Sequence, residues 1–102
     1  MMNFHDARAL AIANGGPLWA AEGLRGTYYV SPDGYETADV WILVDGAEEY
    51  LLGGDEDYVP MDKPVTVVFK RSGELVRISS LEARPLLRDA ADVHDPDPTP
   101  PA

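Results

Sequence analysis

The chain contains no cysteine and only two histidines among its 102 residues. Without cysteine it has no disulfide, no thiolate metal site and no cysteine nucleophile, which is compatible with a reducing cytoplasm. Neither histidine has a serine and a carboxylate arranged around it as in a catalytic triad: we expect His5 in the first turn of a helix and His94 in a loose tail. We therefore expect a protein that is not an enzyme.

Long apolar runs are also missing. No uninterrupted apolar segment approaches the roughly 20 residues that a membrane-spanning helix requires. The first residues lack the basic stretch and following apolar run of a secretory signal. These features predict a soluble cytoplasmic protein with no membrane partner.

Basic residues are scarce, with eight Lys and Arg against 18 Asp and Glu and a net charge of −10. Nucleic-acid binders normally carry the opposite sign, because Lys and Arg displace counterions from phosphates. The charge therefore argues against direct binding of nucleic acid and favours a basic protein partner.

The acidic residues are concentrated where basic ones are absent. Residues 26–62 contain no Lys or Arg at all, and they contain ten carboxylates: Asp33, Glu36, Asp39, Asp45, Glu48, Glu49, Asp55, Glu56, Asp57 and Asp62. The sign reverses over residues 63–88, which carry six basic residues against two acidic ones. We expect the ten carboxylates to form one strongly negative side of the folded domain, where they speed the encounter with a basic partner.

No motif indicates a metal or a cofactor. The acidic run 55–57, with Asp62, lacks the glycine and glutamate spacing of an EF-hand loop, so we read it as a solvated loop. Gly15-Gly16 is followed by a proline, and Gly53-Gly54 leads into three acids, so neither pair fits a phosphate-binding loop.

The fold is predicted from residues that typically begin or end helices and strands, and from the spacing of apolar residues. Asn3 is a good N-cap for a helix over residues 4–13, which the Asn-Gly-Gly-Pro sequence of residues 14–17 would end. Strands are expected at residues 27–30, 37–44, 49–52, 65–70 and 74–78. The strand over residues 37–44 has Val40, Ile42 and Val44 on one face and Trp41 and Leu43 on the other, so it is expected at the centre of the sheet. A turn is expected at residues 31–34, and a tight Asp-Gly hairpin at residues 45–46.

Ser79 and Glu82 have the spacing of a capping box, which predicts a short C-terminal helix limited by Pro85. Strands that follow one another without helical crossovers favour an antiparallel sheet. We therefore predict one α+β domain over residues 1–90, with the N-terminal helix packed on a four- to five-stranded antiparallel meander and a short C-terminal helix. Residues 91–102 are expected to be a disordered tail rich in Pro and Asp.

Residues 64–75, read Pro-Val-Thr-Val-Val-Phe-Lys-Arg-Ser-Gly-Glu-Leu, resemble the hairpin of the YrhB-like family, also called immunity protein 35. Its members have a proline, an apolar strand ending in lysine, a Ser/Thr-Gly turn and a second apolar strand. Residues 40–44 and 50–53 are similar to the family's tryptophan-containing strand and its return toward a glycine-rich loop, and the alanine-rich first helix also fits. The resemblance implies an immunity protein that neutralises a cognate toxin.

Aromatic residues next to the acidic stretch complete the predicted partner-binding site. Tyrosines beside charged groups have the composition of a binding hot spot. The predicted site residues are Tyr35, Asp39, Glu48, Glu49, Asp55, Glu56, Asp57 and Tyr58.

Three functions remain open at this point. The first is an immunity-type inhibitor that covers a basic toxin surface. The second is a phage-encoded or regulatory decoy for a host protein's nucleic-acid-binding surface, and the third is a small hydrolase with converging carboxylates. The sequence is compatible with a monomer or a homodimer.

Overall fold

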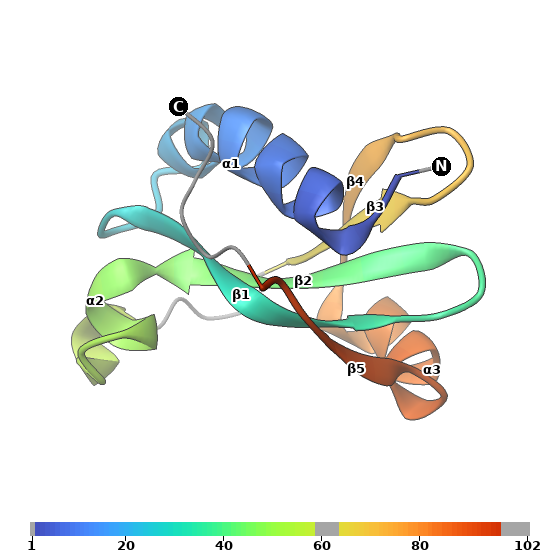
Figure 1. Ribbon diagram of the computed structural model, residues 1–102. Coiled ribbons are helices and arrows are strands. Elements are labelled where there is room, and N and C mark those ends of the chain that lie inside the picture. Colours follow the sequence, from blue (N-terminus) through green and yellow to red (C-terminus); the bar gives the residue numbers. More distant parts are fainter. Residues whose placement is uncertain (1, 59–63, 97–102) are drawn as a thin grey trace.

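The protein folds as a five-stranded antiparallel sheet with a helix on each face, as the α+β prediction required (Figure 1). The computed structural model describes residues 2–58 and 64–96. The strands lie in the order β4-β3-β2-β1-β5. The elements, in chain order, are α1 (Phe4–Ala21), β1 (Tyr28–Glu36), β2 (Val40–Ala47), α2 (Glu48–Leu51), the 3-10 helix η1 (Glu56–Tyr58), β3 (Val65–Phe69), β4 (Leu75–Ile78), α3 (Ser80–Arg88) and β5 (Ala91–His94).

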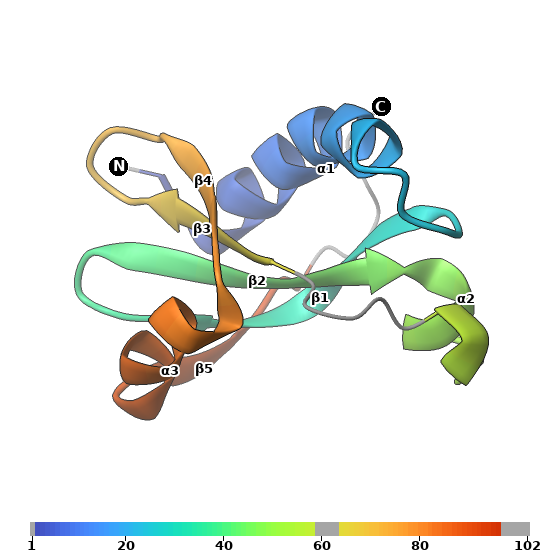
Figure 2. The ribbon, with the colours of Figure 1, turned by 180° about the vertical axis from the view of Figure 1, so that it is seen from behind.

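Strand β2 is the centre of the sheet, and its side chains build a core on each face. Trp41 and Leu43 pack with Phe4 of α1 on one face, as the alternation of apolar residues predicted. Val40 and Ile42 pack on the other face, against side chains that include Leu86 of α3. Helix α1 covers the first face, and α3 covers one end of the second (Figure 2). No helix in the described part of the chain is long and apolar enough to span a membrane.

Helix α1 begins as predicted but does not end where the sequence indicated. Asn3 caps it and forms a capping box with Asp6. The helix then continues through residues 14–17 to Ala21, so the predicted stop is wrong. The last turn is fixed by Trp19, which is buried and donates its indole N–H to the carbonyl of Gly26 at 3.0 Å. This tertiary packing outweighs the local preference of Gly and Pro to end a helix.

The first hairpin is longer than predicted, and its turn lies elsewhere. Residues 31–34 belong to β1, where the pairing register shifts between Val30 and Gly34, and the chain turns at residues 37–39 instead. The Asp45-Gly46 pair lies inside β2 rather than in a turn. Residues 48–51 form helix α2, so the predicted return strand over residues 49–52 is also wrong.

Asp45 explains why β2 runs through the expected turn. Its carboxylate is buried and accepts hydrogen bonds from the hydroxyls of Tyr28, at 2.7 Å, and Thr66, at 2.6 Å. These residues come from the strands on either side of β2. Because a buried carboxylate needs such partners, the three side chains hold residues 45–47 in the sheet.

The predicted disordered tail is wrong for its first residues. Residues 91–94 form β5, which pairs antiparallel with β1. Asp95 follows and is fully buried, with its carboxylate 2.8 Å from His5 Nδ1 and 3.6 Å from Arg8 Nη1. Arg8 is buried too, and it donates to the carbonyl of Val30. The ion pair joins α1 to the end of β5, a long-range contact that local composition does not reveal. The remainder of the tail, residues 97–102, lies outside the described residues.

Stability is expected to fall at alkaline pH because of Tyr28. Burial, and then the neighbouring Asp45 carboxylate, raise the pKa of Tyr28 above its ordinary value of 10.0. The unfolded chain loses this proton near pH 10, whereas the folded protein keeps it. The contribution of Tyr28 to the free energy of unfolding is therefore complete below pH 10. Above pH 10 this contribution decreases by at most about 1.4 kcal/mol per pH unit.

Urea unfolding at pH 9, 10 and 11 measures this dependence. Tyr28→Phe lacks the titrating hydroxyl and should show a shallower decline between pH 10 and 11 than the original protein. Equal slopes would contradict the assignment to Tyr28.

Candidate protein-binding surface

The structure separates the predicted acidic site residues into two groups at opposite ends of the sheet. Asp39 lies in the turn between β1 and β2, whereas Glu48 begins α2 at the far end of β2 (Figure 1). The eight residues of β2 span roughly 25 Å at about 3.3 Å per residue. The expectation that all ten carboxylates of residues 26–62 gather on one side is therefore wrong. One of them, Asp62, lies outside the described residues.

Several of these carboxylates are engaged in structural contacts. Glu36 pairs with Lys70 of the β3–β4 turn at 2.8 Å, and Asp33 pairs with His94 of β5 at 2.7 Å. Asp45 is buried between hydroxyls. Both partners, Lys70 and His94, come from the C-terminal third, so long-range contacts partly fill the sequence gap in basic residues.

Glu49 is a predicted site residue with a structural role. Its carboxylate accepts a hydrogen bond from the backbone N–H of Thr27 at 2.9 Å. That bond is the main reason why the pKa of Glu49 lies below its ordinary value. Glu49 thereby ties α2 to the start of β1, and it is less available to a partner than its neighbours.

Four further acidic residues lie on or between the adjoining elements α2 and η1, a region that we call the acidic end: Glu48, Asp55, Glu56 and Asp57. All four are exposed, and none of them forms an ion pair within the described residues. Asp55 accepts from the backbone N–H of Asp57 at 3.1 Å, which shapes the loop. Tyr58 is half-buried and lies under the guanidinium of Arg25, at 5.2 Å from the ring centre. Within the described residues, no ion pair neutralises these four carboxylates, and Arg25 is a cation close to them.

A groove runs beside the acidic end on the sheet face opposite α1. Its volume is about 480 Å³, and we call it the tyrosine groove. Its lining comes from β1, β2 and the end of α2: Tyr29, Ser31, Pro32, Asp33, Tyr35, Val44, Leu51 and Leu52. A further hollow of about 260 Å³ shares Asp33, Tyr35 and Val44 with the groove and extends toward β5. Helices α2 and α3 lie at opposite ends of this face (Figures 1 and 2).

The two tyrosines give the groove its chemical character. Tyr29 and Tyr35 are half-buried, and neither hydroxyl has a hydrogen-bond partner in the described part of the protein. Rigid aromatic side chains with a free polar tip are common anchors at protein interfaces. Tyr35 was predicted from the sequence as an anchor. Four groove residues were not predicted from the sequence: Tyr29, Val44, Leu51 and Leu52. The two leucines were missed because residues 49–52 were predicted to form a strand and not the helix α2.

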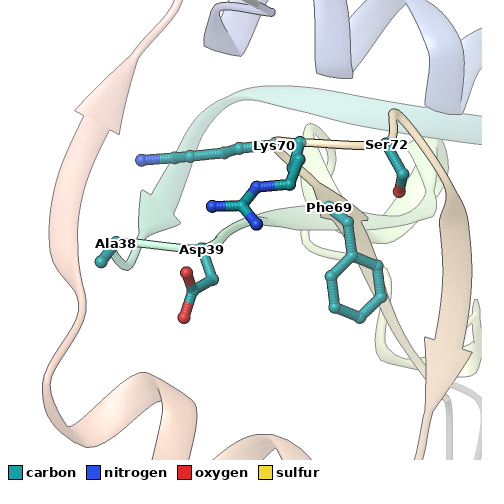
Figure 3. A pocket seen from close by; sticks show the side chains of 6 residues that line it. Ala38, Asp39, Phe69, Lys70 and Ser72 are labelled. Carbon is teal, nitrogen blue, oxygen red and sulfur yellow. The ribbon is translucent and has the colours of Figure 1, made fainter.

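Asp39 belongs to a different surface, at the end where the hairpins turn (Figure 3). There a pocket of about 500 Å³ is lined by Ala38, Asp39, Phe69, Lys70, Arg71 and Ser72. A neighbouring recess of about 370 Å³ shares Asp39 and Phe69 and reaches α3. Lys70 is held by Glu36, and its ammonium lies 4.2 Å from the centre of the Trp41 ring. Because this surface carries both signs of charge, it lacks the uniform field of the acidic end.

No protein-family model, characterised protein or solved structure matches this chain significantly. The resemblance to immunity protein 35 therefore stays a prediction. Among the described residues, no group of three His, Asp or Glu side chains is arranged to hold a metal ion.

Proposed function

We propose that this protein works by binding a basic protein, through the acidic end and the adjoining tyrosine groove. The observation that carries the proposal is the placement of carboxylates without an ion pair among the described residues beside a groove lined by both apolar and polar side chains. Leu51 and Leu52 line the groove, and Glu48 lies one helical turn before them on α2. Charge and apolar area therefore adjoin on one surface.

The two parts of the surface make different contributions to binding. The exposed carboxylates of the acidic end steer a cationic partner and raise the rate of encounter, an effect that salt screens. The tyrosines and leucines supply apolar area that is desolvated on docking, which slows dissociation. A surface of this kind suits an inhibitor that covers a cationic active site.

The most specific form of the proposal is an immunity-type inhibitor that neutralises a basic toxin, with no catalysis and no cofactor. Both the charge of the acidic end and the sequence resemblance of residues 64–75 support this form. A toxin gene adjacent to the gene for this protein would add independent support.

Affinity capture from the native host tests the proposal. Immobilised protein is exposed to lysate at low and at high salt, and the retained proteins are identified. We expect one basic protein that is retained at low salt and much reduced at high salt, because screening weakens contacts between exposed charges. A variant with Glu56→Gln and Asp57→Asn should retain less of it. Retention of acidic proteins only, or of none under either condition, would contradict the proposal.

A further inference from the structure

Resting on the proposed function, we propose that the tyrosine groove receives one large apolar side chain from a cationic segment of the partner. The segment's Lys or Arg residues, on both sides of this anchor, would contact the carboxylates that flank the groove. The occupant is thus defined by its chemistry: a basic stretch of protein with a single aromatic or large aliphatic residue at its centre.

The shape of the groove fits an anchor of this kind. Val44 of the central strand lines it, together with Tyr29 and Tyr35 of β1 and Leu51 of α2. A volume of about 480 Å³ lies within the usual range for pockets that hold a small ligand, so one aromatic side chain fits with part of its backbone. The hydroxyls of the two tyrosines, which have no hydrogen-bond partner among the described residues, can then bond to the backbone of the bound segment.

The charges around the groove determine which charge its binding partner should carry. The described side chains that line the groove include one carboxylate, Asp33, and no basic residue. Asp33 is exposed and pairs with His94, which is itself exposed. Glu48 lies on α2, one helical turn before the leucines that line the groove. A segment bound in the groove is therefore near carboxylates from both β1 and α2, which favours Lys or Arg in that segment.

A second copy of the chain is the competing occupant. Helix α3 carries two arginines, Arg84 and Arg88, and exposes Leu81 and Leu87. Such a contact would join different surfaces of the two copies and generate open chains or rings. The net charge of −10 opposes self-association, which is why a foreign cationic segment is favoured.

Two synthetic peptides test the inference on the intact protein. Both are short and carry lysines on each side of the centre, and they differ only at the central residue, where one has tryptophan and the other serine. Binding is followed by NMR with isotope-labelled protein. We expect the tryptophan peptide to bind about tenfold tighter, because the groove buries its indole ring. Its addition should shift the amide signals of Tyr29, Val44 and Leu52.

Matched variants locate the effect. Leu52 and Leu81 are both exposed leucines, at 63% and 70% exposure, on opposite sides of this face. Leu52→Ala should reduce the preference for the tryptophan peptide over the serine peptide at least threefold. Leu81→Ala should leave this preference unchanged. Val44→Trp, which fills the groove, should abolish the preference while the serine peptide still binds.

The outcomes separate the two proposals. If both peptides shift the signals of Glu48 and Glu56 equally, and the groove signals do not move, the acidic end binds cations but the anchor site is refuted. If neither peptide shifts any signal at low salt, the proposed function fails as well. Concentration-dependent association of the protein alone, lost in both Val44→Trp and Leu81→Ala, would show that a second copy occupies the groove and would overturn the inference.

Discussion

Replacing Arg8 with alanine is expected to lower the free energy of unfolding by about 3–5 kcal/mol, a large effect for a single substitution. Arg8 and Asp95 are both buried, and the guanidinium also donates to the carbonyls of Val30 and Ser31. Without Arg8, the fully buried carboxylate of Asp95 loses its main cationic neighbour, and the carbonyls lose a donor. Both changes carry a desolvation cost that folding must overcome.

Urea unfolding measures this effect, and Arg88→Ala is its control. Arg88 is an exposed arginine in the last turn of α3, so its removal should change the stability by less than about 0.5 kcal/mol. We also expect β5 to detach in the Arg8 variant, which hydrogen exchange at residues 91–94 would report. A loss below about 1 kcal/mol would show that the buried ion pair does not hold the C-terminal strand.

The substitution Gly15→Ala is expected to destabilise the protein, although alanine normally stabilises a helix. An added Cβ at residue 15 would clash with the Tyr28 hydroxyl oxygen, which is bonded to Asp45 and cannot move away freely. Crowding of a packed core costs about 1–3 kcal/mol, and the helix propensity of alanine returns about 1 kcal/mol. The net loss of stability should therefore be up to about 2 kcal/mol.

Gly16→Ala is a matched control on the same helix. An added Cβ at residue 16 meets no atom within 4 Å. This variant should therefore gain about 0.5–1 kcal/mol from helix propensity alone. Thermal unfolding of the two variants should shift in opposite directions. If both variants were stabilised, the close approach of α1 to Tyr28 would be contradicted.

Gly15 also shows why the sequence misplaced the end of α1. Read locally, Gly15, Gly16 and Pro17 are signals that end a helix. In the structure Gly15 is required because Tyr28 passes beneath it, a contact between α1 and β1 that no local pattern encodes. The error at the Asp45-Gly46 pair has the same origin, since Asp45 is held by hydroxyls from two other strands.

Features determined by local periodicity were predicted well. The alternation of Val40, Trp41, Ile42 and Leu43 predicted a central strand with two apolar faces. The Ser79 cap of α3, whose hydroxyl accepts from the N–H of Glu82, was likewise predicted from spacing. Residues 65–69 and 75–78 form the expected hairpin. Short-range chemistry fixes each of these elements, so a single sequence suffices to predict them.

The candidate surface was only partly predictable. The absence of basic residues over residues 26–62 predicted one negative side with all ten carboxylates, whereas the structure places only some of them in the α2 and η1 region. Charge along a sequence does not show which end of a strand a residue occupies, so Asp39 was grouped with carboxylates at the far end of the sheet. The pairing of Glu36 with Lys70 and of Asp33 with His94 was equally hidden, because each joins residues far apart in the sequence.

The rate at which the captured basic partner associates with two charge-matched variants tests the central claim most directly. One variant carries Glu56→Gln and Asp57→Asn at the acidic end. The other carries Asp39→Asn and Glu74→Gln, at the end of the sheet where the hairpins turn. Both variants therefore lose the same net charge. Stopped-flow or surface-based kinetics over a range of salt concentrations would give the association rate constants. We predict that the first variant associates about threefold to tenfold more slowly at low salt, with a weaker salt dependence, while the second stays within about twofold of the original protein. Equal slowing of both variants would show that net charge alone acts, and would contradict a partner-binding surface at the acidic end.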